Sequence, residues 1–557
     1  MFVKNDSQQM RLDDPLNNMP KYLKRQLKNS WAHYFQKHIF PAINEERFEV
    51  IYSDNHASRP NSPVNVIIGL LVIKELFDQT DEEVIGSLHF DDRYQYALRT
   101  TSFEKQPVSQ NTLTNFRNRV YDYYKETGID LIQQEVESLS SKIAQYLQID
   151  NEQARMDSFM VSSSCKNLSR IGLVYEVNAN FIDLLNDKSP ENIPDKCRGY
   201  LEKGHKQDTI YKTRNKETES KLEFLLYQSQ LLYETGLKIG DKVTDTEEFK
   251  LLERILDEQT KDDDDDDSNR PTPKEGENIS SNSLQNPSDP DATFRYKYGP
   301  NIGYTINVFE VFNENNSIIQ TYDLQANTYD DSQFTEDIIN KLPNQENSFS
   351  LLLDGAYYSY DLAKKSAAKN IELIPGDLKG RKPAQDKLSY ATFSIDETAN
   401  LITTCINGNE PVYSKYDEEL NVYTAKFNKT DCKNCSHKEN CRISEQKKYN
   451  TIRFSDKDYQ IALLREKMET EEYQKLANKR AGIEGIPSTF RRKYNIDDLP
   501  VRGKVRVKMW LGFKIMAYNF KKLLKGLQNS NIPSVYRLYL SLIAILMFNI
   551  QEKEFNA

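Results

Sequence analysis

The sequence predicts an α/β protein in which a mixed sheet flanked by helices follows an all-helical N-terminal domain and is interrupted by two insertions. Three observations predict this fold class. Helical periodicity runs through residues 20–145, short strands alternate with helices between 151 and 380, and two long segments break that alternation. The chain of 557 residues is long enough for several domains of about 150 residues each.

The N-terminal domain, residues 1–150, is predicted to contain helices only. Apolar residues recur at helical spacing from Val64 to Leu76, directly after Pro63. This spacing predicts a long helix with a hydrophobic face.

A second helix of this domain is expected to begin at a cap at Ser109 or Asn111. Residues 110–120 carry Arg117 and Arg119 after a polar turn, and two interpretations stay open. The segment is either a helix-turn-helix reader of DNA or an ordinary amphipathic helix with solvated arginines, and the second interpretation is favoured without a groove-facing geometry.

The central part of the chain alternates between strands and helices. The expected strands are 154–161, 302–312, 318–324, 349–353 and 371–374, and the expected helices are 330–342 and 359–370. The first strand carries Asp157 and the fourth ends at Asp354. Residues 151–165, 294–380 and 455–528 are therefore assigned to one sheet-containing core.

Two insertions separate the parts of this core. The first is a helical segment, 166–261, followed by an acidic linker, 262–293, that is predicted to be disordered because its aspartates, serines and prolines cannot bury a core. The second, 381–454, has strand-like pieces at 390–395 and 422–427 and contains four of the six cysteines. Residues 529–557 are expected to form a C-terminal helix.

The charge of the chain is unevenly distributed. The formal net charge is -10, which by itself argues against a polyanion-binding protein. Residues 241–291 hold 17 acidic and 6 basic side chains, whereas residues 475–528 hold 14 basic and 3 acidic ones. An acidic block therefore masks a basic region, and we expect this block to shield that region from non-specific DNA.

Three acids stand where a sheet can gather them. Asp157 lies on the first strand, Asp354 ends the fourth and Glu484 follows on a later helix, and strand ends are where such folds build sites. Carboxylate oxygens suit Mg²⁺ or Mn²⁺, and two such ions support phosphodiester chemistry. By spacing alone the prediction is weak, because an Asp at a strand end is more often a turn or cap residue.

The motifs around these acids resemble those of a known family. The three segments are Ala154-Arg-Met-Asp157-Ser-Phe, Leu351-Leu-Leu-Asp354-Gly-Ala-Tyr357 and Arg480-Ala-Gly-Ile-Glu484-Gly. They resemble the acidic motifs of DDE transposases of bacterial insertion sequences, of the IS1182 type within the IS4-like group. The helical block from Arg59 to Arg119 and the segment from Ser288 to Lys297 extend the resemblance over nearly the whole chain.

The resemblance implies an RNase H-like core that binds transposon ends, hydrolyses DNA with two divalent ions and joins the ends to target DNA. Asp157, Asp354 and Glu484 match the metal-binding acids, and Arg480 matches an arginine of the third motif. In the IS4-like pattern a tyrosine and a lysine stand where this chain has Ala477 and Arg491. A homodimer in a synaptic complex is implied because two DNA ends must be held together.

Two other functions stay open on the sequence: a DNA-binding or assembly protein without catalysis, and an RNase H-like nuclease without strand transfer. Double-stranded DNA is the expected partner in each of the DNA-processing interpretations. The side chains predicted to contact it are Lys297, Arg480, Arg491, Arg492, Lys493, Arg502, Lys504, Arg506 and Lys508. The competing explanation is a solvated charged face, and for Arg480 with Glu484 a weak helical ion pair.

Four cysteines of the second insertion form a candidate Zn²⁺ site. Cys432, Cys435 and Cys441 share one loop, and Cys405 lies upstream. Four thiolates would hold a tetrahedral structural zinc, with His437 as a competing ligand, and free thiols are an equally weighted alternative.

The sequence also predicts a location. The N-terminus has no apolar stretch typical of a signal peptide, and the longest apolar run, 538–550, is shorter than the ~20 residues of a spanning helix. We therefore expect a cytoplasmic, nucleoid-associated protein that does not enter a membrane.

Overall fold

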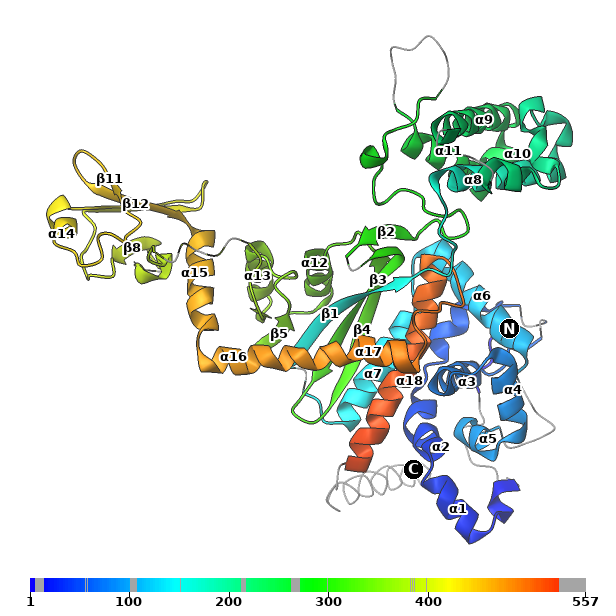
Figure 1. Ribbon diagram of the computed structural model, residues 1–557. Helices are drawn as coiled ribbons and strands as arrows, with labels where there is room; N and C mark the ends of the chain where they lie inside the picture. The colour runs from blue at the N-terminus through cyan, green and yellow to red at the C-terminus, as the bar shows by residue number, and fades with distance from the viewer. Residues whose placement is uncertain are drawn as a thin grey trace. The chain divides into compact units, whose positions relative to one another are not determined.

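The computed structural model describes residues 1–5, 15–55, 57, 59–100, 108–150, 152–211, 217–261, 271–297, 299–380, 382, 384, 386–396 and 398–529. The chain divides into two compact units. The first comprises residues 1–150, 158–329 and 486–557, and the second comprises 151–157 and 330–485. The class is mixed α/β with a mixed sheet, as the sequence predicted (Figure 1).

The N-terminal part of the first unit contains seven α-helices and no strand among its described residues. They are α1 (Lys21–Lys28), α2 (Trp31–Tyr34), α3 (Val64–Phe77), α4 (Asp81–Phe90), α5 (Asp92–Leu98), α6 (Gln110–Thr127) and α7 (Leu131–Tyr146), with short turns at 35–51. Helix α6 begins after Ser109, whose side chain accepts the backbone N–H of Thr112. This cap is one of the two that the sequence predicted.

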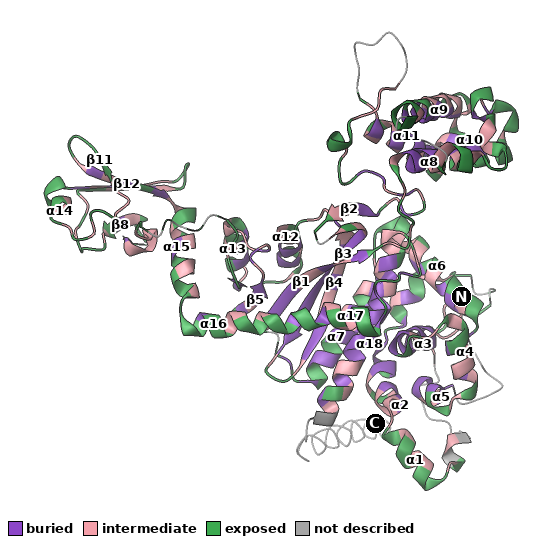
Figure 2. Ribbon diagram, in the orientation of Figure 1, coloured by how far each residue is buried: buried purple, intermediate pink, exposed green. Residues whose placement is uncertain are grey.

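Helix α18 (Lys504–Asn529) is the central helix of the first unit and packs against α3, α7 and β4. Its side chains Val507, Leu511, Ile515 and Leu523 are fully buried (Figure 2). Gly512 permits this packing, because a Cβ at that position would lie 2.6 Å from the hydroxyl oxygen of Tyr322.

Three antiparallel strands belong to the first unit. They are β2 (Thr293–Tyr296), β3 (Pro300–Phe312) and β4 (Ser317–Ala326). Strands β3 and β4 pair from Tyr304 with Ala326 to Phe312 with Ser317, with a bulge after Phe309. The sequence predicted β3 and β4 but missed β2, which is only four residues long.

The second unit has three parallel strands, β1 (Gln153–Ser162), β5 (Phe349–Leu353) and β6 (Ile371–Pro375). Helices α12 (Asp331–Lys341) and α13 (Tyr360–Ala367) precede and follow β5. The sheet order is β2-β3-β1-β5-β6, with β4 paired to β3, and β1 passes from the second unit into the first after Asp157. The predicted strands and helices of this region agree with these bounds to within a few residues.

The first insertion has a hydrophobic core of its own. It contains α8 (Arg170–Lys188), α9 (Thr218–Ile239), α10 (Asp241–Thr244) and α11 (Glu247–Gln259). Phe181, Leu185, Leu226 and Leu252 are fully buried in that core. The aspartate run Asp262–Asp267 lies outside the described residues.

The prediction of a disordered linker over 262–293 is wrong for residues 271–293. Leu284 and Asp289 are buried there, and the backbone N–H of Leu284 donates to the carboxylate of Glu258 at 2.6 Å. Composition failed as a guide because this polar segment is ordered by hydrogen bonds to residues distant in sequence.

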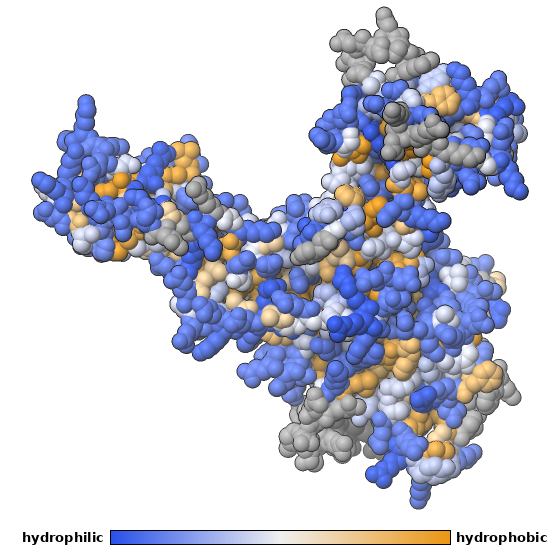
Figure 3. Space-filling model, in the orientation of Figure 1, coloured by the Kyte–Doolittle hydropathy of each residue, from blue (hydrophilic) through white to orange (hydrophobic). Residues whose placement is uncertain are grey.

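The second insertion is built on small antiparallel sheets. Strands β9 (Tyr413–Asp417), β10 (Val422–Phe427), β11 (Ser444–Glu445) and β12 (Asn450–Ser455) form one sheet, and β7 (Ser394–Asp396) pairs with β8 (Leu401–Thr404). Helix α14 (Lys429–Lys433) follows β10. The core is small, with Phe393, Phe427 and Ile452 buried, and hydrophilic side chains cover most of the face in view (Figure 3).

The last part of the second unit is helical up to the third acid. Helices α15 (Asp456–Met468) and α16 (Glu471–Asn478) are followed by the 3₁₀ turn η11 (Lys479–Glu484), and α17 (Gly485–Lys493) comes next. The predicted C-terminal helix, 529–557, lies outside the described residues apart from its first residue. Within the described part of the chain, no helix is long and apolar enough to cross a membrane.

Candidate active site

Two of the three acids lie at the same level on neighbouring parallel strands. Strand β1 pairs with β5 in a register that sets Arg155 opposite Leu352. Asp157 and Asp354 each stand two residues further along, so that register sets Asp157, in the middle of β1, beside Asp354 at the carboxyl end of β5. Leu351, Leu352 and Leu353 are fully buried before Asp354, and this burial fixes the end of β5.

Glu484 is the last residue of the turn η11, which belongs to the same unit. Ile483 is fully buried and anchors the turn, whereas 59% of the Glu484 side chain is exposed. Arg480 donates from Nη2 to Oε1 of Glu484 at 3.0 Å, as the i,i+4 spacing predicted. An ideal Cβ on Gly376, just after β6, would lie 3.8 Å from Nε of Arg480, so Arg480 borders the same sheet edge.

A buried arginine joins the strand of the first acid to the turn of the third. Nη1 of Arg155 donates to the carbonyl oxygen of Lys479 at 2.6 Å. Its guanidinium lies against Gly482, where an added Cβ would be only 2.0 Å from Nη1. The three acidic motifs are thereby brought to one edge of the second unit.

A fourth carboxylate, Asp377, stands at this edge. The backbone N–H of Gly355 donates both to Oδ1 of Asp354 at 2.7 Å and to Oδ1 of Asp377 at 2.9 Å. Any side chain at 355 would collide with Asp377, because an ideal Cβ there would lie 2.3 Å from that Oδ1. Asp377 was not predicted from the sequence, where its only signal is its place two residues after a strand.

The acids suit a divalent cation by their chemistry but are not arranged around one ion. Asp157, Asp354 and Glu484 supply carboxylate oxygens, which Mg²⁺ and Mn²⁺ prefer. Among the described residues no three His, Cys, Asp or Glu side chains form a group that could hold a metal ion. The carboxylate of Glu484 is instead paired with Arg480.

Most of the predicted DNA-contacting residues lie in the first unit. Arg491, Arg492 and Lys493 end α17 and are exposed, as are Arg502, Arg506 and Lys297. Nη2 of Arg491 donates to the carbonyl oxygen of Met160 at 2.9 Å, and its Nε contacts Asp497. Arg502 contacts Ser164, and the guanidinium of Arg506 lies over the ring of Tyr121 at 4.4 Å.

Lys504 and Lys508 of α18, two of the predicted DNA-contacting residues, are partly buried, whereas Arg506 on the same helix is exposed. Nζ of Lys508 lies 3.0 Å from Asp323 and 3.7 Å from Asp130, and only 13% of this side chain is exposed. Nζ of Lys504 donates to Gln325 at 2.6 Å, and burial lowers its pKa. Counting acids within 475–528 could not reveal these partners, because they come from other segments.

Asp289, in the Ser288–Lys297 segment, accepts hydrogen bonds from three separate segments, which the sequence did not predict. It is fully buried and accepts hydrogen bonds from Ser163, Tyr304 and the backbone N–H of Gly503. Asp291 accepts the backbone N–H of Lys504 at 3.0 Å. The two aspartates thus fix the start of α18 to strands β1 and β3.

The four cysteines of the second insertion are near one another but form no metal-binding group among the described residues. Cys405, Cys432 and Cys441 pack against the same small core. Burial raises the pKa of the Cys432 and Cys441 thiols, and the neighbouring cysteines, Cys435 included, raise it further. Zinc binding therefore stays a prediction.

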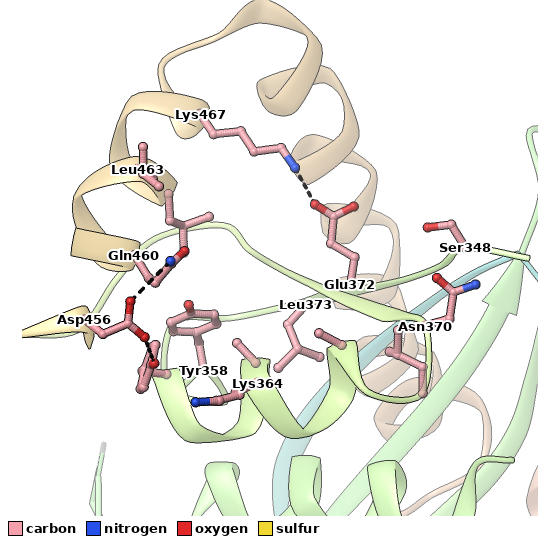
Figure 4. A pocket seen from close by; sticks show the side chains of 15 residues that line it. Ser348, Tyr358, Lys364, Asn370, Glu372, Leu373, Asp456, Gln460, Leu463 and Lys467 are labelled. Carbon is pink, nitrogen blue, oxygen red and sulfur yellow. Dashed lines mark hydrogen bonds and ion pairs between the residues drawn. The ribbon is translucent and has the colours of Figure 1, made fainter. Parts of the chain in front are cut away.

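A cavity of the second unit lies away from the acids. It has a volume of about 560 Å³ and is lined by α13, the start of β6 and α15 (Figure 4). Lys467 pairs with Glu372 and Tyr360 with Asp456 at its rim. Because Ile371 and Glu372 begin β6, this cavity is at the amino edge of the strands and plays no part in the candidate active site.

The class of protein follows from comparison with family models, which supports a transposase or nuclease enzyme in general terms. Comparison with family models gives two matches: the transposase DDE domain over residues 404–524, and a transposase domain (DUF772) over residues 23–119. These two matches indicate a DDE transposase of the IS1182-like kind. The first match includes Glu484 but neither Asp157 nor Asp354, and the IS4-like grouping stays a prediction.

Searches of curated proteins and of solved structures gave no significant match to this chain.

Proposed function

We propose that this DNA transposase binds transposon ends and catalyses metal-dependent phosphodiester hydrolysis and strand transfer through Asp157, Asp354 and Glu484. The observation that carries the proposal is the pairing of β1 with β5, which sets two acids side by side on neighbouring strands. The turn that ends in Glu484 contacts the same strand through Arg155. We further propose that this core is RNase H-like.

The three carboxylates would hold Mg²⁺ or Mn²⁺, two ions in the full proposal. Such ions supply an activated water or 3′-hydroxyl and stabilise the leaving oxygen. Arg480 screens the negative charge of Glu484 and borders the strand ends, where a DNA phosphate would approach. To bind an ion, Glu484 must break its ion pair with Arg480. Because 59% of the Glu484 side chain is exposed, that side chain is free to rotate.

Double-stranded DNA is the proposed ligand of the exposed cations. Arg492 and Lys493 at the end of α17 and Arg502 before α18 present charges that suit phosphate contacts. Lys508 is left out of this proposal because it is paired with Asp323. A protein dimer is proposed because two DNA ends must be held together.

The proposal is tested with DNA that carries the inverted repeats flanking the gene. The purified chain should nick these ends in Mg²⁺ or Mn²⁺ and join them to a second duplex. Asp157→Asn, Asp354→Asn and Glu484→Gln should each abolish both products while leaving end binding intact. Asp361→Asn, which alters an exposed acid of α13 in the same unit, is the matched control and should retain activity.

The alternatives give different products in the same assay. Binding without any nick in the unaltered chain would support a DNA-binding protein without catalysis. Nicks without a joined species would support a nuclease, and full activity in any of the three acid variants would contradict the assigned triad.

A further inference from the structure

We propose that Arg155 is a positioning residue for the third acid. Its guanidinium holds the turn η11 against strand β1, which carries Asp157, and this contact sets where Glu484 can reach the metal ions. The inference rests on the proposed function, in which Asp157, Asp354 and Glu484 act together.

Two contacts of Arg155 carry the inference. The side chain is only 8% exposed, and Nη1 donates to the carbonyl oxygen of Lys479 at 2.6 Å. The guanidinium also lies close against Gly482, since an ideal Cβ there would lie 2.0 Å from Nη1, 2.6 Å from Cζ and 2.7 Å from Nη2. This close contact is possible only because residue 482 has no side chain.

Side chains of β1 alternate between its two faces, and this alternation explains why the Arg155 contact also matters for Asp157. Gln153, Arg155 and Asp157 lie on one face of the strand, whereas Ala154 and Met156 are fully buried on the other. The face that presents Asp157 is therefore the face that holds η11. Gln153 adds a weaker contact, because its Oε1 accepts from Nζ of Lys479 at 3.4 Å.

Arginine is suited to this contact because its guanidinium carries several nitrogens in one rigid group. One nitrogen donates to the carbonyl oxygen of Lys479 while the group also lies beside Gly482, which the compact ammonium of a lysine would not do. Arg155 thus links the first and third motifs without contacting substrate.

The test measures metal binding and is independent of turnover. Mn²⁺ affinity is measured by electron paramagnetic resonance on the full chain, together with binding to end DNA and cleavage. Outer partners of a metal site commonly change metal affinity by 10 to 100-fold, so Arg155→Ala should weaken Mn²⁺ binding by about tenfold. End-DNA binding should be unchanged, because no phosphate contact is removed.

Gly482→Ala provides a second variant that reaches the same contact from the other side. The added methyl group displaces the end of a flexible side chain, so the chain should remain folded. It should weaken Mn²⁺ binding as Arg155→Ala does. The double variant should bind Mn²⁺ no more weakly than either single variant. The Mn²⁺ affinity of Arg155→Lys should remain about fivefold or more below that of the unaltered chain, because lysine lacks the planar guanidinium group.

Arg453→Ala, an exposed arginine on strand β12 of the same unit, is the matched control and should bind Mn²⁺ normally. Unaltered Mn²⁺ affinity in Arg155→Ala and Gly482→Ala would overturn the positioning role, as would additive losses in the double variant. An unaltered chain that binds no Mn²⁺ would instead overturn the proposed function and this inference with it.

Discussion

Lys514 of α18 and Glu75 of α3 form an ion pair of 2.7 Å in the interior of the first unit. Only 2% and 7% of the two side chains are exposed. Lys514 also lies 4.4 Å from the ring centroid of Trp510. The pair joins two helices that are more than 400 residues apart in sequence, and it explains how a cationic helix can be a core helix.

Glu75→Gln should destabilise the first unit strongly, because it leaves the Lys514 ammonium buried without its countercharge. The expected loss is about 3–5 kcal/mol in urea unfolding. Glu75→Gln with Lys514→Met should recover most of that loss. Lys4→Met, which breaks an exposed pair with Glu46, is the control and should cost roughly 1 kcal/mol or less.

The stability of the first unit should depend on pH through Glu135. This carboxyl is fully buried, burial raises its pKa to about 7, and the Arg47 guanidinium at 2.9 Å opposes that shift. Because its pKa is raised, this group makes its full contribution to the free energy of unfolding below its ordinary pKa. That contribution is lost as pH rises through 7. Glu135→Gln should therefore gain stability relative to the unaltered chain between pH 5 and pH 8. Parallel unfolding curves at the two pH values would contradict this.

Asp289→Asn should be far more damaging than Asp291→Asn. Asp289 is buried with three donors, and loss of its charge should cost about 3 kcal/mol. Asp291 is exposed and accepts the backbone N–H of Lys504 at the start of α18, so its change should cost about 1 kcal/mol. Thermal unfolding compares the two variants. Equal decreases in their melting temperatures would contradict the structural role assigned to Asp289.

Neutralising the aspartate run should increase non-specific DNA binding. Replacing Asp262–Asp267 by asparagine removes six negative charges without changing the chain length. Affinity for DNA without end sequences should rise at low salt and converge with that of the unaltered chain at high salt. Unchanged affinity at low salt would show that the run does not shield the cations. Substitution is preferable to deleting residues 262–290, because that segment includes the buried Asp289.

The cysteine set makes a separate prediction about metal content. If Cys405, Cys432, Cys435 and Cys441 bind Zn²⁺, the purified chain carries one zinc per molecule and Cys432→Ser loses it. Cys197→Ser, a buried cysteine of the first insertion, is the control and should retain the zinc. A chain free of zinc after expression in zinc-supplemented medium would support free thiols.

Much of the fold could be predicted from local sequence. The bounds of β5 agree with the prediction because a run of buried leucines ends at a polar turn. The cap at Ser109 follows from a side chain that hydrogen-bonds its own helix. Such features depend on neighbours within a few residues, and the sequence shows those neighbours directly.

The partners of the charged groups could not be predicted in the same way. Lys508 and Lys514 appear in the sequence as members of a basic strip, yet Asp323 and Glu75 neutralise them. The linker prediction failed over 271–293 for the same reason, since Asp289 is ordered by Ser163, Tyr304 and Gly503. Each of these partners lies far away along the chain.

The sequence by itself determined the strands, the helices and the three acidic motifs with their order. Only the tertiary structure decided that β1 and β5 are parallel neighbours, that Arg155 reaches Gly482, and which cations remain exposed. The physical reason is the range of the interactions. Periodicity and capping act over one or two turns, whereas strand pairing and buried charge pairs join segments whose proximity is set only when the whole unit packs.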